Sequence, residues 1–228
     1  MSVNRPAAGG GREILVAAGR AVRWIDGFDA RHRITTAVPT AHGLRITAAD
    51  GSVADCALPL GATMPPAEPG ADSWTAIERF GELARRPVRV GVVFARRAAV
   101  AVGRFDGARL VESKVDKSYV QGRTAAGGWS QQRYQRRRGN QADHAAGKAA
   151  DLVNRLLVPV VDRLAAVVTA GDREAVAAIL ADRRLSGLAD RAVSPHIGDV
   201  GEPRLASLTA LPDRFWVIRI HLTEPVGT

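Results

Sequence analysis

The feature that most constrains the fold is a set of three short apolar runs between residues 88 and 116. The runs cover residues 88–95, 98–105 and 109–116, and valine is common in them, as it is in β-strands. Only Asp106-Gly107 and one neighbour separate the last two runs, and this dipeptide is typical of hairpin turns. Strands joined so closely pair in opposite directions. The spacing therefore predicts an antiparallel three-stranded meander.

A helix is predicted after the meander. Apolar residues between 142 and 157 recur at the three- and four-residue spacing of a helix face. We expect this helix to begin near Ser130, a good N-cap, and to end or bend at Pro159. Residues 118–130 have no usable period, and aperiodic stretches of this length in compact domains are usually functional or disordered. The sequence therefore predicts a glycine-rich loop at 118–130 that leads into the helix.

The rest of this half of the chain predicts a mixed α/β fold. Residues 163–185 are typical of a buried strand, a turn at Gly171-Asp172 and a second helix, which favours parallel pairing. We expect an edge strand near residues 189–195. A closing strand is predicted at residues 214–222, with Trp216 and the apolar residues that alternate with it on one face.

The first part of the chain predicts a small β-rich domain. Short β-like runs begin at residues 13, 21, 43 and 52, with Gly, Asp and Pro turn signals between them. A proline-rich linker follows at 61–72. A helix begins after an Asp72 or Ser73 cap and carries apolar residues, Trp74 among them, at helical spacing. We therefore predict two domains, with residues 1–70 as the β-rich domain and linker, and 71–228 as the second domain.

Composition points to an anionic partner. The 228 residues are 46% hydrophobic, enough for a real core, and 32 Lys+Arg against 23 Asp+Glu give a formal net charge of +9. Nucleic acid is the first candidate partner, and an anionic membrane surface is the second. The single cysteine, Cys56, suits a reducing cytosol. We expect no signal peptide and no membrane span, and hence a cytoplasmic protein.

The basic residues gather around the predicted helix start. No Asp or Glu occurs from residue 118 to 142, while five arginines do. They are Arg123, Arg133, Arg136, Arg137 and Arg138. Arginines in the first turns of a helix oppose its dipole, at a cost of about 0.3 to 1 kcal/mol each, so stability does not favour them. Bound phosphates would turn the same arginines and the free N–H groups of the helix start into one anion site.

Two glycines and two glutamines precede the arginines. Gly127 and Gly128 allow positive φ and close approach of backbone N–H groups to developing negative charge. Gln131 and Gln132 are poor bases, but an amide that both donates and accepts hydrogen bonds can position a water molecule.

Neither a nucleotide-binding P-loop nor a dinucleotide fingerprint is present in the sequence. The five histidines lack metal-ligand spacing, so we expect no metal and no cofactor.

The run from about residue 88 to 212 resembles a known family. Its meander, glycine-rich loop, "GGWSQQRYQRRRGNQADHAAGKAADLVNRLL" and "LAAVVTAGDREAV" are similar to the central catalytic domain of eukaryotic and archaeal class I release factors. The nearest branch is the Vms-like release factors, which include the ankyrin-repeat zinc-finger peptidyl-tRNA hydrolase of ribosome quality control. The resemblance implies an RNase H-like mixed sheet with flanking helices, in addition to the β-rich N-terminal domain.

The resemblance also implies an activity and a set of partners. The family's activity is hydrolysis of the nascent peptide-tRNA ester at the large ribosomal subunit, in termination or in ribosome rescue and quality control. Gln131 corresponds to the catalytic glutamine, since it follows the small Ser130, and Gly127 and Gly128 correspond to the flexible glycines. Arg133 and the arginines at 136–138 correspond to the basic helix start. Ribosomal RNA and peptidyl-tRNA are the expected partners of a monomeric protein.

The sequence departs from the family at the loop tip. Trp129 and Ser130 separate the glycines from the glutamine, so the Gly-Gly-Gln tripeptide of termination factors is absent. Gln132 is the competing catalytic residue, with Gln131 then capping the helix. Trp129 is predicted either to stack on an RNA base or to anchor the loop on its own domain. A non-catalytic ribosome- or RNA-binding module of the same fold is the alternative function. A basic nuclease or nucleoid-associated DNA binder is a third possibility, but this sequence lacks the clustered carboxylates that would hold a nuclease metal.

Overall fold

The chain forms two compact units. The computed structural model describes residues 3–6, 11–96, 99–117, 131–193 and 196–225, and gives the backbone alone for residues 3–5, 117 and 131–143. Unit 1 comprises Met1–Pro87 and Pro212–Thr228, and unit 2 comprises Val88–Leu211. The second unit is therefore continuous in sequence, whereas both ends of the chain contribute to the first.

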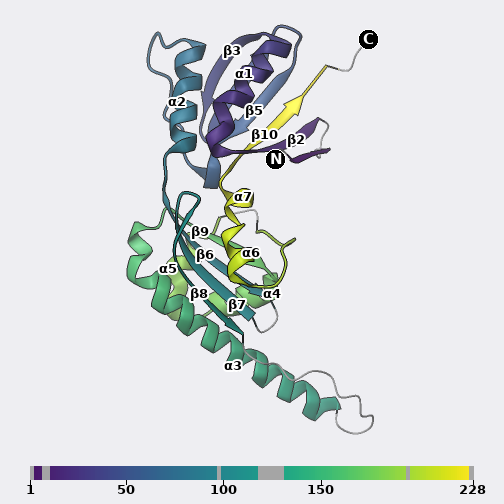
Figure 1. The fold of residues 1–228 in the computed structure, drawn as a ribbon, viewed down its shortest axis with the longest axis vertical. Coiled ribbons are helices and arrows are strands. Elements are labelled where there is room, and N and C mark those ends of the chain that lie inside the picture. The colour runs from purple at the N-terminus through teal and green to yellow at the C-terminus, as the bar shows by residue number, and fades with distance from the viewer. Residues whose placement is uncertain (1–2, 7–10, 97–98, 118–130, 194–195, 226–228) are drawn as a thin grey trace. The chain divides into compact units, whose positions relative to one another are not determined.

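Unit 1 is built on a six-stranded antiparallel sheet with the order β1-β2-β10-β5-β4-β3 (Figure 1). Its strands are β1 (Val3–Pro6), β2 (Arg12–Ala17), β3 (Ile34–Thr40), β4 (Gly43–Ala48), β5 (Val53–Ala57) and β10 (Val217–Thr223). The last strand lies between β2 and β5, so the C-terminal segment closes the sheet. Gly43 makes one close pairing possible, because a Cβ there would collide with the backbone carbonyl of Cys56.

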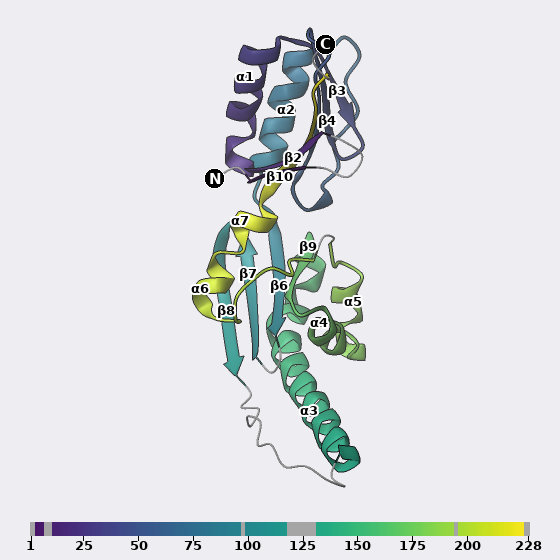
Figure 2. The ribbon, with the colours of Figure 1, turned by 90° about the vertical axis from the view of Figure 1, so that its right-hand side faces the viewer.

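Two helices cover one face of this sheet (Figure 2). They are α1 (Ala21–His32) and α2 (Ser73–Arg85). Unit 1 also contains the short 3-10 turns η1 (Ala18–Arg20) and η2 (Pro59–Gly61) and the single-turn α7 (Pro212–Phe215). Phe28 and Phe80, one from each long helix, are fully buried against Ile46 and Ile220 of the sheet. Asp72 caps α2 by accepting a hydrogen bond from the Thr75 N–H at 2.7 Å.

Unit 2 is built on a four-stranded mixed sheet with the order β8-β7-β6-β9. Its strands are β6 (Arg89–Arg96), β7 (Ala99–Asp106), β8 (Arg109–Lys117) and β9 (Ala166–Gly171). The first three form the antiparallel meander that the sequence predicted, with Gly107 at φ +57° in its turn. β9 pairs with β6 in parallel, as predicted from the strand-turn-helix pattern.

Helices lie on both faces of the second sheet. The long α3 (Gln131–Leu157) and α4 (Arg173–Leu180) share a core with β6 and β7, in which Val102, Val153 and Leu157 are fully buried. Leu208 of α6 (Leu205–Thr209) contacts the opposite face at Gly103. The connecting turns are η3 (Val158–Arg163), η4 (Arg183–Leu185) and α5 (Ser186–Ala189). The mixed α/β fold predicted for this region, with flanking helices, is confirmed.

The predicted strand at residues 21–28 is wrong, because these residues begin α1. Ala21, Ile25 and Phe28 are the buried residues of the helix, at the i, i+4 and i+7 spacing of a helical face. The short run at residue 21 suggested a strand, but packing against the sheet follows the helical period. In place of the edge strand expected near 189–195, the described residues of this range form one isolated bridge, between Ala192 and Val167.

The domain boundary expected at residue 70 also differs from the division in the structure. α2 packs with α1 in the core of unit 1, and the boundary after it follows Pro87. The closing strand β10 was assigned by sequence to the second domain, but it pairs with β2 and β5. Trp74, which the sequence placed among the regularly spaced apolar residues of α2, is 47% exposed.

Candidate functional site

Helix α3 carries the two glutamines and four of the five arginines that the sequence singled out. Gln131 and Gln132 are its first two residues, and Arg133 and residues 136–138 fall within its first eight. The helix thus begins where the sequence predicted, one residue after Ser130. The other predicted site residues, Arg123, Gly127, Gly128 and Trp129, lie outside the described residues together with Ser130.

The fold holds α3 by its C-terminal half. The helix has 27 residues, a length of about 40 Å at 1.5 Å per residue. From Ala149 onward its inner face is buried, whereas His144 and Lys148 are exposed. Figure 2 shows the N-terminal half of α3 extending past the strands of its own unit. The glutamines and arginines therefore begin a helix that projects from the core of unit 2.

Positive charge is concentrated in the same unit. Residues 88–211 hold 20 of the 32 Lys+Arg and 12 of the 23 Asp+Glu, a net charge of +8. The rest of the chain has a net charge of +1. Such an imbalance favours association with a polyanion and does little for folding. Unit 2 is therefore where an anionic partner is most favourably bound.

An arginine from η4 fastens the anchored half of α3. Arg184 Nη2 lies 2.8 Å from Asp151 Oδ1 on α3, and the same guanidinium holds Asp182 through contacts of 2.9 and 2.6 Å. The side-chain hydrogen bonds from Arg184 lower the pKa of Asp182 to about 2. They also keep the pKa of Arg184 above its usual range. Sequence reasoning missed this contact, because Asp151 and Arg184 are far apart in the chain.

The end of β9 has the polar groups of a site, but they satisfy one another. At the turn that the sequence predicted, Gly171 has φ +93°, and Asp172 caps α4 by accepting the Glu174 N–H at 3.0 Å. His196 lies with Nδ1 2.9 Å from Thr169 Oγ1 and with Nε2 2.9 Å from the Gly171 carbonyl. Both ring nitrogens are engaged within the fold, so this histidine is not placed to act as a base.

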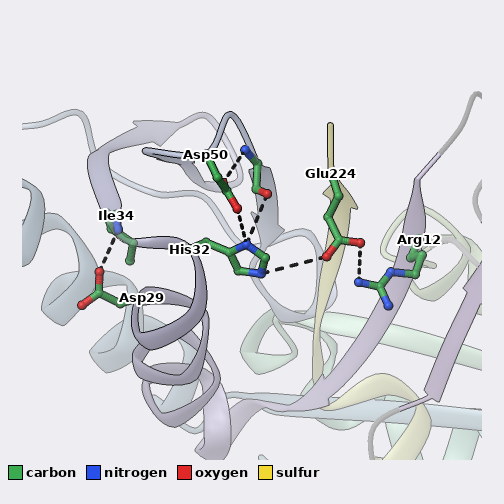
Figure 3. A network of polar contacts seen from close by, with 7 residues as sticks. Arg12, Asp29, His32, Ile34, Asp50 and Glu224 are labelled. Atoms are coloured by element: carbon green, nitrogen blue, oxygen red, sulfur yellow. Dashed lines mark hydrogen bonds and ion pairs between the residues drawn. The ribbon is translucent and has the colours of Figure 1, made fainter. Parts of the chain in front are cut away.

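Unit 1 contains a second polar network, which Figure 3 shows around His32. His32 Nδ1 lies 2.7 Å from Asp50 Oδ2, and Nε2 lies 4.0 Å from Glu224 Oε1. Glu224 also pairs with Arg12 at 2.6 Å. The network joins the end of α1, the β4–β5 turn, the residue that follows β10, and β2. It connects elements that are distant in the sequence.

The geometry of this network does not suit nucleophilic catalysis. In a serine triad the carboxylate and the hydroxyl contact different nitrogens of the histidine. Here Ser52 Oγ lies 3.3 Å from Nδ1, the nitrogen that Asp50 already contacts. The hydrogen bond to His32, with the Ser52 backbone N–H, lowers the pKa of Asp50 to about 2. We therefore interpret the network as a structural tie.

Other chemistries find little support among the described residues. These residues contain no group of three or more His, Cys, Asp or Glu that could hold a metal ion. Burial raises the pKa of the Cys56 thiol to about 12, so it is not a nucleophile near neutral pH. Within the described ranges of the chain, no helix combines the length and apolarity needed to cross a bilayer. The start of α3 is the best candidate site.

Comparison with known proteins bears on this unit. A family model for the Actinobacteria/Chloroflexi VLRF1 release factor matches residues 88–221. The crystal structure of the archaeal translation termination factor aRF1 aligns over 75% of this chain and 51% of its own, with 20% identity and a TM-score of 0.43. Another archaeal protein aligns over 75% and 52%, with 18% identity and a TM-score of 0.36. The chain thus spans about half the length of these structures. No curated protein matches it.

Proposed function

The chain belongs to the Actinobacteria/Chloroflexi VLRF1 release factor family, and on this premise we propose that it hydrolyses peptidyl-tRNA on the large ribosomal subunit. One observation carries the proposal: the family match includes the whole of unit 2, the unit with the glutamine-bearing helix and a net charge of +8. The resemblance predicted from the sequence is thereby confirmed at the level of the family.

The proposed chemistry uses orientation and needs no titrating side chain. The Gln131 amide would hold a water molecule against the ester carbonyl, and backbone N–H groups near Gly127 and Gly128 would face the developing oxyanion. Positioned water and preorganised donors can together lower a barrier substantially without proton transfer by a side chain. Gln132 is the other candidate for this role. The two assignments exclude each other, because successive residues of a helix point about 100° apart and only one of them can face the ester.

The proposed binding partners are ribosomal RNA and the tRNA part of the substrate. Arg123, Arg133 and the arginines at 136–138 would contact phosphates, and Trp129 would stack on a base. No metal or cofactor enters this chemistry. We place the protein in the cytoplasm as a monomer that acts in termination or in ribosome rescue and quality control.

The test is peptide release from purified large subunits that carry labelled peptidyl-tRNA. We expect wild type to release the peptide, and Gln131→Ala to slow release by about 10²- to 10³-fold, the usual cost of removing a transition-state donor. Gln132→Ala is the matched control, since it removes the same amide one position along the helix. If Gln132→Ala alone is inactive, the roles are exchanged.

Release that is unchanged in both variants would exclude the glutamine mechanism. A wild-type protein that binds the subunits but releases nothing would support the rival function, a non-catalytic module. The separation of the Gly-Gly pair from the glutamine by Trp129 and Ser130 is the observation that favours this rival.

A further inference from the structure

The anchored half of α3 presents a line of polar residues to solvent. His144, Lys148, Asp151 and Arg155 are all exposed, and their spacing of four, three and four residues places them on one face of the helix. Lys148 and Arg155 lie about 10 Å apart along the axis. Arg183, also exposed, stands on η4, which packs against α3. Lys148 and Arg155 thus flank Asp151 on the helix, and Arg183 adjoins Arg184 in the turn that packs against it.

The Asp151 carboxylate is held by a residue from outside the helix. Asp151 stands three residues after Lys148 and four before Arg155, the spacings at which ion pairs form within helices. Its carboxylate instead lies 2.8 Å from Arg184. Among the described residues, no ion pair involves Lys148, Arg155 or Arg183. Arg184 therefore leaves these three cations available to an external anion.

We propose that Lys148, Arg155 and Arg183 form a phosphate-binding surface that docks on RNA of the large ribosomal subunit. The inference rests on the proposed function, because it extends the expected phosphate contacts of the helix start along the same helix. Arg137 and Arg133 precede Lys148 by 11 and 15 residues, close to three and four helical turns. The positions of basic residues on this helix thus span about 33 Å from 133 to 155.

The surroundings of this surface favour RNA over a membrane or an acidic protein. Membrane-bound helices need an exposed apolar face, and protein interfaces usually have an apolar core. The exposed large apolar side chains among the residues whose side chains the structure describes are Val38, Trp74, Val111 and Leu205, and none lies on residues 144–157 of α3 or on η4. A surface with cations and no apolar anchor suits a phosphate backbone, which binds mainly through charge.

The surface can be tested by neutralising its three cations together. Lys148→Gln, Arg155→Gln and Arg183→Gln are combined in the full chain, with Gln131→Ala present throughout so that binding is measured without hydrolysis. The control combines Lys114→Gln, Arg173→Gln and Arg204→Gln, which remove the same charges from exposed positions elsewhere in unit 2. Affinity for purified bacterial large subunits is measured across a salt series.

We expect the surface variant to bind roughly tenfold or more weakly at low salt, with its slope of log affinity against log salt reduced by about 2 to 3. The control variant should change both the affinity and the salt slope far less. Equal losses in the two variants would overturn the proposal, as would an unchanged slope. Weaker binding to phosphatidylglycerol vesicles or to polyglutamate with unchanged subunit binding would also overturn it. If wild type binds as expected but never releases peptide, the catalytic proposal fails and the surface stands.

A rescue experiment tests the role of Arg184 as a positioning residue. Arg184→Gln should weaken subunit binding, because Asp151 can then pair with Lys148 and Arg155. Adding Asp151→Asn restores the local charge and should restore affinity. A purely structural role of Arg184 predicts no rescue, since the second substitution also removes the contact between α3 and η4. Failure of the double variant to regain affinity, while thermal unfolding shows it folded, would contradict the proposal.

Discussion

The two units treat charge in different ways. In unit 1 the net charge is +1, and opposite charges meet on neighbouring elements, as in Arg45–Asp55 at 2.6 Å and Arg219–Glu13 at 3.0 Å. In unit 2 the net charge is +8, and the one carboxylate on the exposed line of α3 is held by Arg184. Both units contain ion pairs, but positive and negative charges nearly balance only in unit 1. The excess positive charge of unit 2 is better explained by an anion that the chain does not itself supply.

Replacing the arginines at the start of α3 should produce the largest difference between the units. We expect glutamine at 133, 136, 137 and 138 to lower affinity for large subunits by roughly 100-fold or more and to reduce the salt slope by about 3. Glutamine at four exposed arginines of unit 1, Arg20, Arg23, Arg31 and Arg85, is the matched control. If the two sets of substitutions weakened binding equally, only the net charge of the protein would matter, and unit 2 would not be the preferred site for the anion.

Replacing a helical glycine with alanine should have a smaller effect, on the free energy of unfolding, and this effect should be alike in both units. A Cβ added at Gly27 in α1 or at Gly147 in α3 would meet no neighbouring side chain or packed element within 4 Å. Alanine at either site should raise the free energy of unfolding by about 0.5 to 1 kcal/mol, because glycine costs backbone entropy in a helix. Gly43→Ala should destabilise, since its Cβ would collide with the Cys56 carbonyl. Denaturant midpoints measure all three, and a loss of stability in Gly147→Ala would contradict the open environment seen there.

Acid should have the smallest effect and should again act on both units. Asp50 and Asp182 each have a pKa near 2, lowered from 3.8 by contacts present only in the folded state. A lowered folded pKa gives stability that is present above about pH 4 and is lost as the pH falls towards 2. Asp50→Asn and Asp182→Asn should therefore destabilise at pH 7 and approach wild type near pH 2. Unfolding curves at both pH values test this, and a deficit that stays constant with pH would refute it.

The sequence predicted the local parts of the fold well. The meander, the parallel strand and the start of α3 follow from apolar periodicity and turn residues, which act over a few positions. The placement of β10 was wrong, because nothing in residues 217–223 specifies that β2 and β5 are its neighbours. The helix at 21–32 was missed, because a short apolar run is compatible with both periods until its packing partner is known.

The candidate site likewise has a part that the sequence could predict and a part that it could not. The arginines and glutamines led us to propose the predicted helix start as the site from the sequence alone, and the backbone there is helical from Gln131. The tie between Asp151 and Arg184 could not be predicted, because an acid between two cations on a helix is expected to pair locally. A long-range contact decides which cations remain available, and only the fold reveals it.

The most direct measurement is single-turnover release of peptide from large-subunit complexes at saturating protein, with affinity measured in parallel. We expect Gln131→Ala to lower the release rate by about 10²- to 10³-fold while affinity changes little, because the amide acts mainly in the transition state. Release by wild type that is no faster than in buffer would contradict this mechanism. So would an equal rate for Gln131→Ala, Gln132→Ala and wild type.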